Sequence, residues 1–288
     1  MRTILVPVAD RPECAVALAG AFEFADRLGA NVVGCHIRPH RSSKVQKSPN
    51  WSQPVAGAKK AWENNAKVSD QDARSQSARQ LLESAAQKYG MRIVKRLSQQ
   101  AESLVVWQER VGSPDRVLSI LGPVSDMLVV SRPQEGSNKL AKVFLLEAIL
   151  RSARPVLIVP QHALNSIGKR PVIAWNQSHE AMRSVVAALP ILAKAESVTI
   201  ASIGKDLGLG PGAKDLVKFL KLRGIKACVK HLPKGKPEQL LLDVYSNVDA
   251  DLLLMGAFSR SRLRQWLFGG VTDYMLHKAD IPVLMLHS

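Results

Sequence analysis

The chain of 288 residues is long enough for one large domain or two ordinary ones. Its 46% hydrophobic and 22% charged residues are typical of a globular protein, and no apolar run reaches the ~18 residues that a membrane span needs. The formal net charge of +16 could attract phosphates, nucleic acid or anionic lipid, but it is shared between both halves and aromatic residues for base stacking are few, so a solvated basic surface is favoured over nucleic-acid or membrane binding.

The N-terminal segment MRTILVPVAD lacks the longer apolar core and the small-residue cleavage site of a signal peptide. Cys14, Cys35 and Cys228 form no C-x-x-C pair and lie inside element-like runs, so we expect three buried, reduced thiols. Together these features predict a cytoplasmic protein.

The first elements alternate between strand and helix. Residues 3–8 are strand-like, and Leu18, Phe22 and Ala25 then recur on one face of a helix that Gly29 closes before a strand at 31–37. Residues 39–80 are polar and basic and lack a long apolar period. We interpret them as an inserted segment that begins as a loop and continues as a helix to Gly90.

The pattern of the first half recurs in the second half. The strand-like run at 171–176 matches 3–8, the run at 251–255 matches 126–130, and the run at 281–287 matches 154–160. The offset between matching positions changes by roughly 40 residues before position 112, which locates the insertion in the first copy. We therefore predict two domains of one kind, residues 1–160 and residues 171–288, joined by a linker at 161–170.

Strands and helices also alternate in the second copy. The predicted strands are 171–176, 197–203, 225–231, 251–255 and 282–286, and the predicted helices are 178–193, 213–223, 237–247 and 271–279. Near-continuous apolar strands that alternate with helices predict a parallel sheet covered on both faces. The predicted fold class is α/β, with two tandem five-stranded, doubly wound, Rossmann-like domains.

In such sheets a ligand binds outside the carboxyl ends of the strands, where the strand order reverses. For this connectivity the candidates are the ends of the first and fourth strands of the second copy, Asn176 and Gly256. The stretch from Gly256 to Tyr274 has glycines at both ends and three arginines between them. Gly269 and Gly270 precede the next helix, whose free N–H groups favour an anion, and arginine suits bidentate contact with phosphate.

The second copy resembles the universal stress protein family, above all at residues 251–287, and also at 171–192 and 210–220. The first copy resembles it through residues 3–8 and 126–160, so that the resemblance covers nearly the whole chain in a tandem arrangement. It implies an adenine nucleotide alpha hydrolase-like fold and a role in stress response or regulation without catalysis. Nucleotide-binding members carry G-x-x-G, nine residues, then G-[S/T], and bind ATP or a related nucleotide there, and Mg²⁺ could accompany it.

Two of the four loop positions depart from that motif. Gly256 and Gly269 match its first and third glycines, whereas Ser259 replaces the second glycine and Gly270 the hydroxyl residue, with a hydroxyl returning at Thr272. Asn176 and Ser178 match an Asp-x-Ser pattern with Asn in place of Asp. The residues that the resemblance places at a nucleotide are Asn176, Ser178, Ser202, Gly256, Ser259, Arg260, Ser261, Arg262, Gly269, Gly270, Val271 and Thr272.

The first copy departs from the nucleotide-binding motif further than the second copy does. Ser131 stands in place of Gly256, and residues 142–145 replace 269–272 with bulky Val143 and Phe144. We therefore expect one nucleotide site per chain at most, in the second copy. The alternative is a nucleotide-free protein that contacts an unknown protein partner through the basic insertion.

No Walker loop, nucleophile elbow or short metal-ligand spacing occurs in the sequence, which predicts a protein that is not an enzyme, with weak nucleotide hydrolysis as the remaining catalytic alternative. The last strands of the two copies would expose unpaired backbone at sheet edges. Universal stress protein dimers pair such strands, so we expect the two halves to pair as an internal pseudo-dimer.

Overall fold

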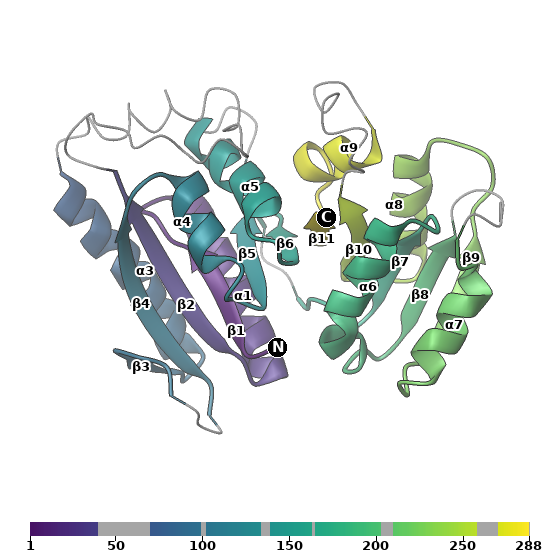
Figure 1. Cartoon of the computed structure of the whole chain (residues 1–288), viewed down its shortest axis with the longest axis horizontal. Helices are drawn as coiled ribbons and strands as arrows, with labels where there is room; N and C mark the ends of the chain where they lie inside the picture. The colour runs from purple at the N-terminus through teal and green to yellow at the C-terminus, as the bar shows by residue number, and fades with distance from the viewer. Residues whose placement is uncertain are drawn as a thin grey trace. The chain divides into compact units, whose positions relative to one another are not determined.

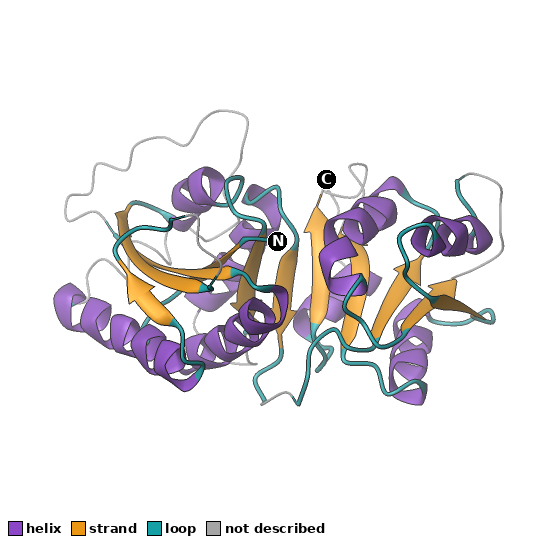
Figure 2. Cartoon of the chain, turned by 90° about the horizontal axis from the view of Figure 1, so that it is seen from below, coloured by secondary structure: helices purple, strands orange, loops and turns teal. Residues whose placement is uncertain are grey.

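The computed structural model of the chain describes residues 1–39, 70–98, 102–133, 139–162, 165–202, 210–257 and 270–287. It divides into two compact units, Met1–Ala163 and Leu164–Ser288 (Figure 1). Each unit is a parallel sheet with helices on both sides of the strands (Figure 2). The α/β fold class predicted from the sequence is confirmed.

The first unit has the strand order β3-β4-β2-β1-β5-β6. Its strands are β1 (Thr3–Pro7), β2 (Asn31–Arg38), β3 (Arg92–Val94), β4 (Leu104–Val111), β5 (Met127–Ser131) and β6 (Val156–Val159), and its helices are α1 (Pro12–Leu28), α3 (Gln71–Lys88), α4 (Pro114–Leu121) and α5 (Lys139–Arg151). The expected helix before Gly90 is α3. The described part of this unit contains six strands rather than the predicted five, because the short β3 pairs with the outer edge of β4.

Local signals explain where the helices of this unit begin and end. Pro12 opens α1, and Gly29 ends it in the left-handed conformation with φ 66°. The carboxylate of Asp70 accepts a hydrogen bond from the backbone N–H of Ala73 and caps α3. A Cβ at Gly34 of β2 would lie 2.7 Å from Cδ2 of Leu82, so the glycine lets α3 pack closely on the sheet.

The second unit has the strand order β11-β10-β7-β8-β9. Its strands are β7 (Pro171–Trp175), β8 (Val198–Ser202), β9 (Ala227–His231), β10 (Leu252–Ala257) and β11 (Val283–His287), and its helices are α6 (His179–Leu192), α7 (Ala213–Lys221), α8 (Pro237–Asn247) and α9 (Val271–His277). Each of these elements overlaps one that the sequence predicts, and α8 has the predicted bounds.

A carboxylate holds the start of the first strand in each unit, half-buried in the first unit and buried in the second. Asp126 accepts hydrogen bonds from the backbone N–H groups of Arg2 and Thr3, at 2.7 and 2.9 Å. Its counterpart Asp251 accepts three backbone N–H bonds, from residues 168, 169 and 170, and one from the hydroxyl of Ser166. Residues 166–170, expected to be linker, are therefore fixed to the second unit.

The expectation of three buried thiols is wrong for one cysteine. Cys14 and Cys35 are buried, but Cys228 is exposed. Cys228 lies on β9, an end strand of the second unit, and alternate side chains of an end strand point away from the covering helix α7.

Candidate functional site

The strand order of the second unit reverses at β7, which pairs with β8 on one side and with β10 on the other. Because all these strands are parallel, their carboxyl ends share one edge of the sheet. Asn176 follows β7, Ser202 ends β8, and Gly256 lies near the end of β10. The structure thus brings three of the sequence-predicted site residues to one edge, at the position where doubly wound sheets bind ligands.

Asn176 and Ser178 form a small hydrogen-bonded turn at this edge. The side-chain oxygen of Asn176 accepts bonds from the backbone N–H and the hydroxyl of Ser178, at 3.2 and 2.7 Å. The Ser178 hydroxyl in turn accepts a bond from the backbone N–H of Ala181 and caps α6. Asn176 is exposed, and within the described residues its amide NH₂ group has no partner, so this group can donate to a ligand.

The segment that precedes α7 lies against the end of β7. A Cβ at Gly210 would lie 2.4 Å from the carbonyl oxygen of Gln177, which itself has a positive φ of 64°. The indole N–H of Trp175 donates to the carbonyl of Pro211 at 3.1 Å. The side chain of Trp175 is fully buried, so it is a core residue and does not border a ligand. Ser202 is buried beside it in the sheet register.

Gly256 is explained by packing inside the unit. A Cβ there would lie 2.7 Å from the carbonyl carbon of Glu180 and 2.8 Å from the backbone nitrogen of Ala181. These atoms belong to the first turn of α6, so glycine lets this turn touch β10. The sequence predicted Gly256 as a site residue, and the close contact with α6 shows a structural need for the glycine that the sequence alone did not indicate.

The helix α9 begins directly after Gly270, whose φ of 121° is a conformation that favours glycine. A Cβ at this position would meet no atom within 4 Å, so the space beside it is open among the described residues. Val271 and Thr272 follow in the first turn and are half-buried. The remaining predicted residues, Ser259, Arg260, Ser261, Arg262 and Gly269, lie outside the described residues.

The corresponding place in the first unit, between β1 and β5, holds a large side chain. Phe144, the counterpart of Val271, is 8% exposed, and the guanidinium of Arg11 lies over its ring at 5.2 Å. Cys14 lies in the same wall, and burial raises the pKa of its thiol. The cavity left between these side chains measures about 30 Å³, whereas small-molecule sites are on the order of 300–1,000 Å³.

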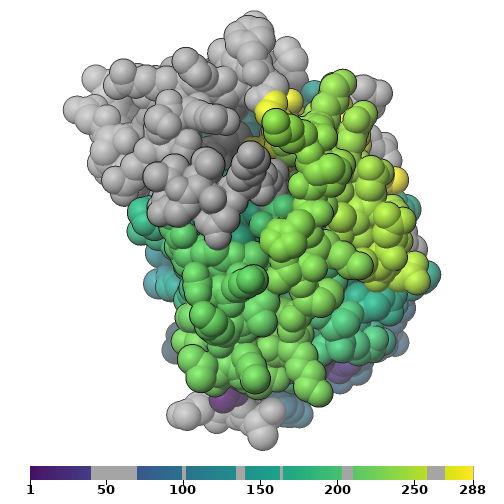
Figure 3. All heavy atoms as spheres, turned by 90° about the vertical axis from the view of Figure 1, so that its right-hand side faces the viewer, coloured from purple at the N-terminus to yellow at the C-terminus, as the bar shows by residue number. Residues whose placement is uncertain are grey.

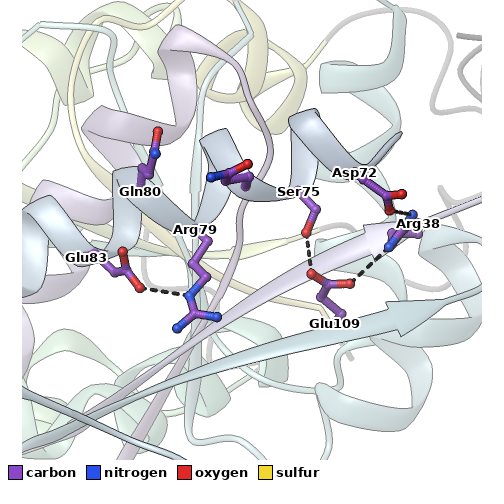
Figure 4. A pocket seen from close by; sticks show the side chains of 8 residues that line it. Arg38, Asp72, Ser75, Arg79, Gln80, Glu83 and Glu109 are labelled. Carbon is purple, nitrogen blue, oxygen red and sulfur yellow. Dashed lines mark hydrogen bonds and ion pairs between the residues drawn. The ribbon is translucent and has the colours of Figure 1, made fainter. Parts of the chain in front are cut away.

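A second hollow of the first unit, which the sequence did not indicate, is a polar groove of about 440 Å³ between α3 and the strands β2 and β4 (Figure 4). Arg38 forms ion pairs with Asp72 and Glu109, and the Ser75 hydroxyl donates to Glu109. Burial opposes ionisation of Glu109, but the bonds from Ser75 and Arg38 lower its pKa below the ordinary value. Its lining has three carboxylates and two guanidinium groups, so the groove does not favour an anion.

His36 lies beside this groove and is buried, with 5% exposure. Its Nδ1 lies 2.8 Å from the carbonyl oxygen of Val8 and its ring stacks on Trp107 at 6.0 Å. The other ring nitrogen, Nε2, is buried with no hydrogen-bond partner in the part of the chain that the structure describes. Burial lowers the pKa of His36 below its ordinary value of 6.5.

Metal binding and membrane insertion find no support in the described ranges. No group of three or more His, Cys, Asp or Glu side chains there could hold a metal ion. Among the same residues, none of the helices is both long enough and apolar enough to cross a bilayer.

The fold and its switch point place the chain in the class of doubly wound α/β proteins. A family model described as "Universal stress protein family" matches residues 174–287. Universal stress protein Slr1230 of Synechocystis sp. is 26% identical over 278 residues, 90% of this chain and 91% of that protein. The crystal structure of a universal stress protein from Archaeoglobus fulgidus has a TM-score of 0.68, with 15% identity, and covers 99% of this chain and 98% of its own. A putative universal stress protein from Pseudomonas aeruginosa has a TM-score of 0.57, with 14% identity, and covers 100% of this chain and 93% of its own. Residues 174–287, nearly the whole second unit, thus match the universal stress protein family, and the chain as a whole is similar to universal stress proteins in sequence and fold.

Proposed function

We propose that the second unit binds one adenine nucleotide at the carboxyl edge between β7 and β10, and that the first unit binds none. The observation that carries this proposal is the difference between the two copies at one place. In the first unit Phe144 packs under Arg11 and leaves about 30 Å³. In the second unit the smaller Val271 is the counterpart of Phe144, and it follows a glycine that has open space beside it among the described residues. We infer a role in stress sensing or regulation.

The described residues fit a nucleotide in part. The amide NH₂ of Asn176 can donate to a ribose or phosphate oxygen, and the Thr272 hydroxyl lies in the first turn after Gly270. The arginines expected to contact phosphate lie at 260 and 262. Asp273 is the carboxylate of this turn, and it pairs with His277 at 3.2 Å. Phosphoryl transfer needs a carboxylate that holds a metal, so this pairing favours binding over hydrolysis, with any Mg²⁺ entering on the nucleotide itself.

Calorimetric titration of the full chain with ATP, ADP and AMP tests the proposal. The variant Val271→Phe copies the residue of the first unit into the second, and we expect it to abolish the binding heat. The matched control Val186→Phe adds the same ring at a position of α6 that is 48% exposed and should bind as the unmodified chain does. Absence of binding heat for all three nucleotides with the unmodified chain would contradict the proposal.

The alternative function, contact with a protein partner through the basic insertion at 39–80, rests on residues that are mostly outside the described ranges. The ends of that segment are described. Arg38 and Asp72, which lie on either side of residues 40–69, are joined by an ion pair, so these residues can be replaced by a short linker without pulling β2 and α3 apart. A partner that is recovered equally well with this deletion variant and with the unmodified chain would count against the alternative.

Two further expectations belong to this proposal and stay predictions. One is the pairing of the two halves through their last strands as an internal pseudo-dimer, and the other is residence in the cytoplasm. Cross-linking between cysteines introduced into the two last strands would test the first, and cell fractionation the second.

A further inference from the structure

The positive charge of the second half is concentrated in one short segment. Residues 213–236 carry eight Lys and Arg side chains and one acidic side chain, Asp215. The rest of residues 161–288 has nine basic and nine acidic side chains, which balance. The whole excess of the second half therefore lies on α7, β9 and the loop after β9, rather than being spread over the surface.

These basic side chains are exposed and mostly unneutralised. Lys214, Lys218 and Lys221 share one face of α7, and all three are exposed, as are Lys226 and Lys230 beside and on β9. Within the described residues, this segment forms one ion pair, between Lys218 and Asp215 at 3.3 Å. The carboxylate of Asp215 also accepts a hydrogen bond from the backbone N–H of Gly212. Figure 3 shows this side of the second unit, with α7 and β9 in green.

The strand at the centre of this charge is an end strand. β9 pairs with β8, and within the described residues no strand lies on its other side. An end strand presents a row of unpaired backbone N–H and C=O groups. In the first unit the corresponding strand, β4, has β3 on its outer side. The second copy therefore leaves open an edge that the first copy covers.

The two faces of β9 differ in chemistry. Cys228 and Lys230 are exposed on one face, whereas Ala227 and Val229 are half-buried on the face that contacts α7. A strand added alongside β9 would place its own side chains alternately on these two faces. Acidic side chains would meet the lysines on one face, and small apolar side chains would extend the contact with α7 on the other.

The same features disfavour other occupants. A second copy of β9 would oppose lysine to lysine, which is destabilising. Single-stranded nucleic acid gains much of its affinity from base stacking on aromatic rings, but the one Phe, Tyr or Trp of residues 213–236, Phe219, has the guanidinium of Arg223 over its ring at 3.6 Å. A nucleic acid or a lipid headgroup also cannot continue the hydrogen-bond ladder of a sheet.

We propose that β9 is a docking edge for an acidic, extended segment of a partner protein, which adds as a further strand with alternating acidic and apolar residues. Backbone hydrogen bonds supply the contact, and the surrounding lysines select the charge of the partner. This surface is separate from the carboxyl edge of the sheet and does not depend on nucleotide binding.

Fluorescence anisotropy with the full chain and a labelled peptide of sequence ETEVETE tests this proposal. We expect saturable binding that weakens about tenfold or more for the double variant Lys226→Glu, Lys230→Glu. The matched control Lys194→Glu, Lys278→Glu changes two exposed lysines of the same unit outside residues 213–236 and should retain the affinity within about twofold.

Two further probes separate strand pairing from simple attraction of charge. The same peptide with an N-methyl group on every residue keeps its charge but loses the backbone N–H donors of both edges, and we expect its binding to be lost. A 20-base-pair DNA duplex and vesicles containing phosphatidylserine should bind more weakly than the peptide. Equal binding of the methylated peptide, tighter binding of DNA or vesicles, or equal loss in the control variant would overturn the proposal.

Discussion

At the scale of single residues, Asp251 joins the segment before β7 to the sheet. Its carboxylate is 7% exposed and accepts four hydrogen bonds. Asp251→Ala leaves three backbone N–H groups without an acceptor, and we expect a loss of about 2–4 kcal/mol in the free energy of unfolding of the second unit. Urea unfolding measures it. The exposed Asp243→Ala is the control, and an equally small change in both variants would refute this role.

His36 gives the first unit a predictable response to acid. Burial lowers its pKa below 6.5, and Arg38 and Arg74 add to this, while the bond to Val8 and the charge of Glu109 oppose it. The unfolded chain then binds the proton more readily, so the contribution of His36 to stability is complete above pH 6.5 and is lost as the pH falls through the lowered pKa.

We expect the urea midpoint of the first unit to fall between pH about 7.5 and about 5, and His36→Gln to reduce this dependence. The exposed His277→Gln is the control and should leave it unchanged. A dependence that is identical in His36→Gln and in the unmodified chain would contradict the assignment to His36.

At the scale of elements, the close approach of α6 to β10 depends on Gly256. Gly256→Ala would place a methyl group 2.7 Å from backbone of α6, which cannot yield as a side-chain end can. We expect a loss of about 1–3 kcal/mol in unfolding free energy. In the control Gly235→Ala, the nearest atom is Cδ1 of Leu240 at 3.2 Å, a flexible group, and the cost should be small. Thermal unfolding of the two variants compares them directly.

The elements were largely predictable from the sequence because local signals mark them. Apolar periodicity predicted the strands and helices of the second unit, and the repeat predicted β1, β5 and β6 of the first unit. The rest depends on contacts between distant residues. The pairing of β3 with β4, the packing of Gly256 on Glu180 and the ring stack of His36 on Trp107 join positions that no local pattern relates. For the same reason the polar groove and the exposure of Cys228 were not foreseen.

At the scale of the whole molecule, the two units share one architecture and differ at two places. The first unit fills its strand-end site with Phe144 and covers the outer edge of β4 with β3. The second unit has Val271 in place of Phe144. Its end strand β9 is basic, and among the described residues no strand covers its outer edge. A duplicated fold has thus diverged, and both surfaces that we propose for binding lie on the second copy.

The central claim is that one nucleotide binds at the strand ends of the second unit. Hydrogen exchange of the full chain, measured by mass spectrometry with and without saturating ATP, tests it most directly. We predict slower exchange in peptides that cover residues 174–180 and 270–276, and unchanged exchange in the counterparts at 6–12 and 143–149. Slower exchange in the first-unit peptides, or no change in either set, would contradict the claim.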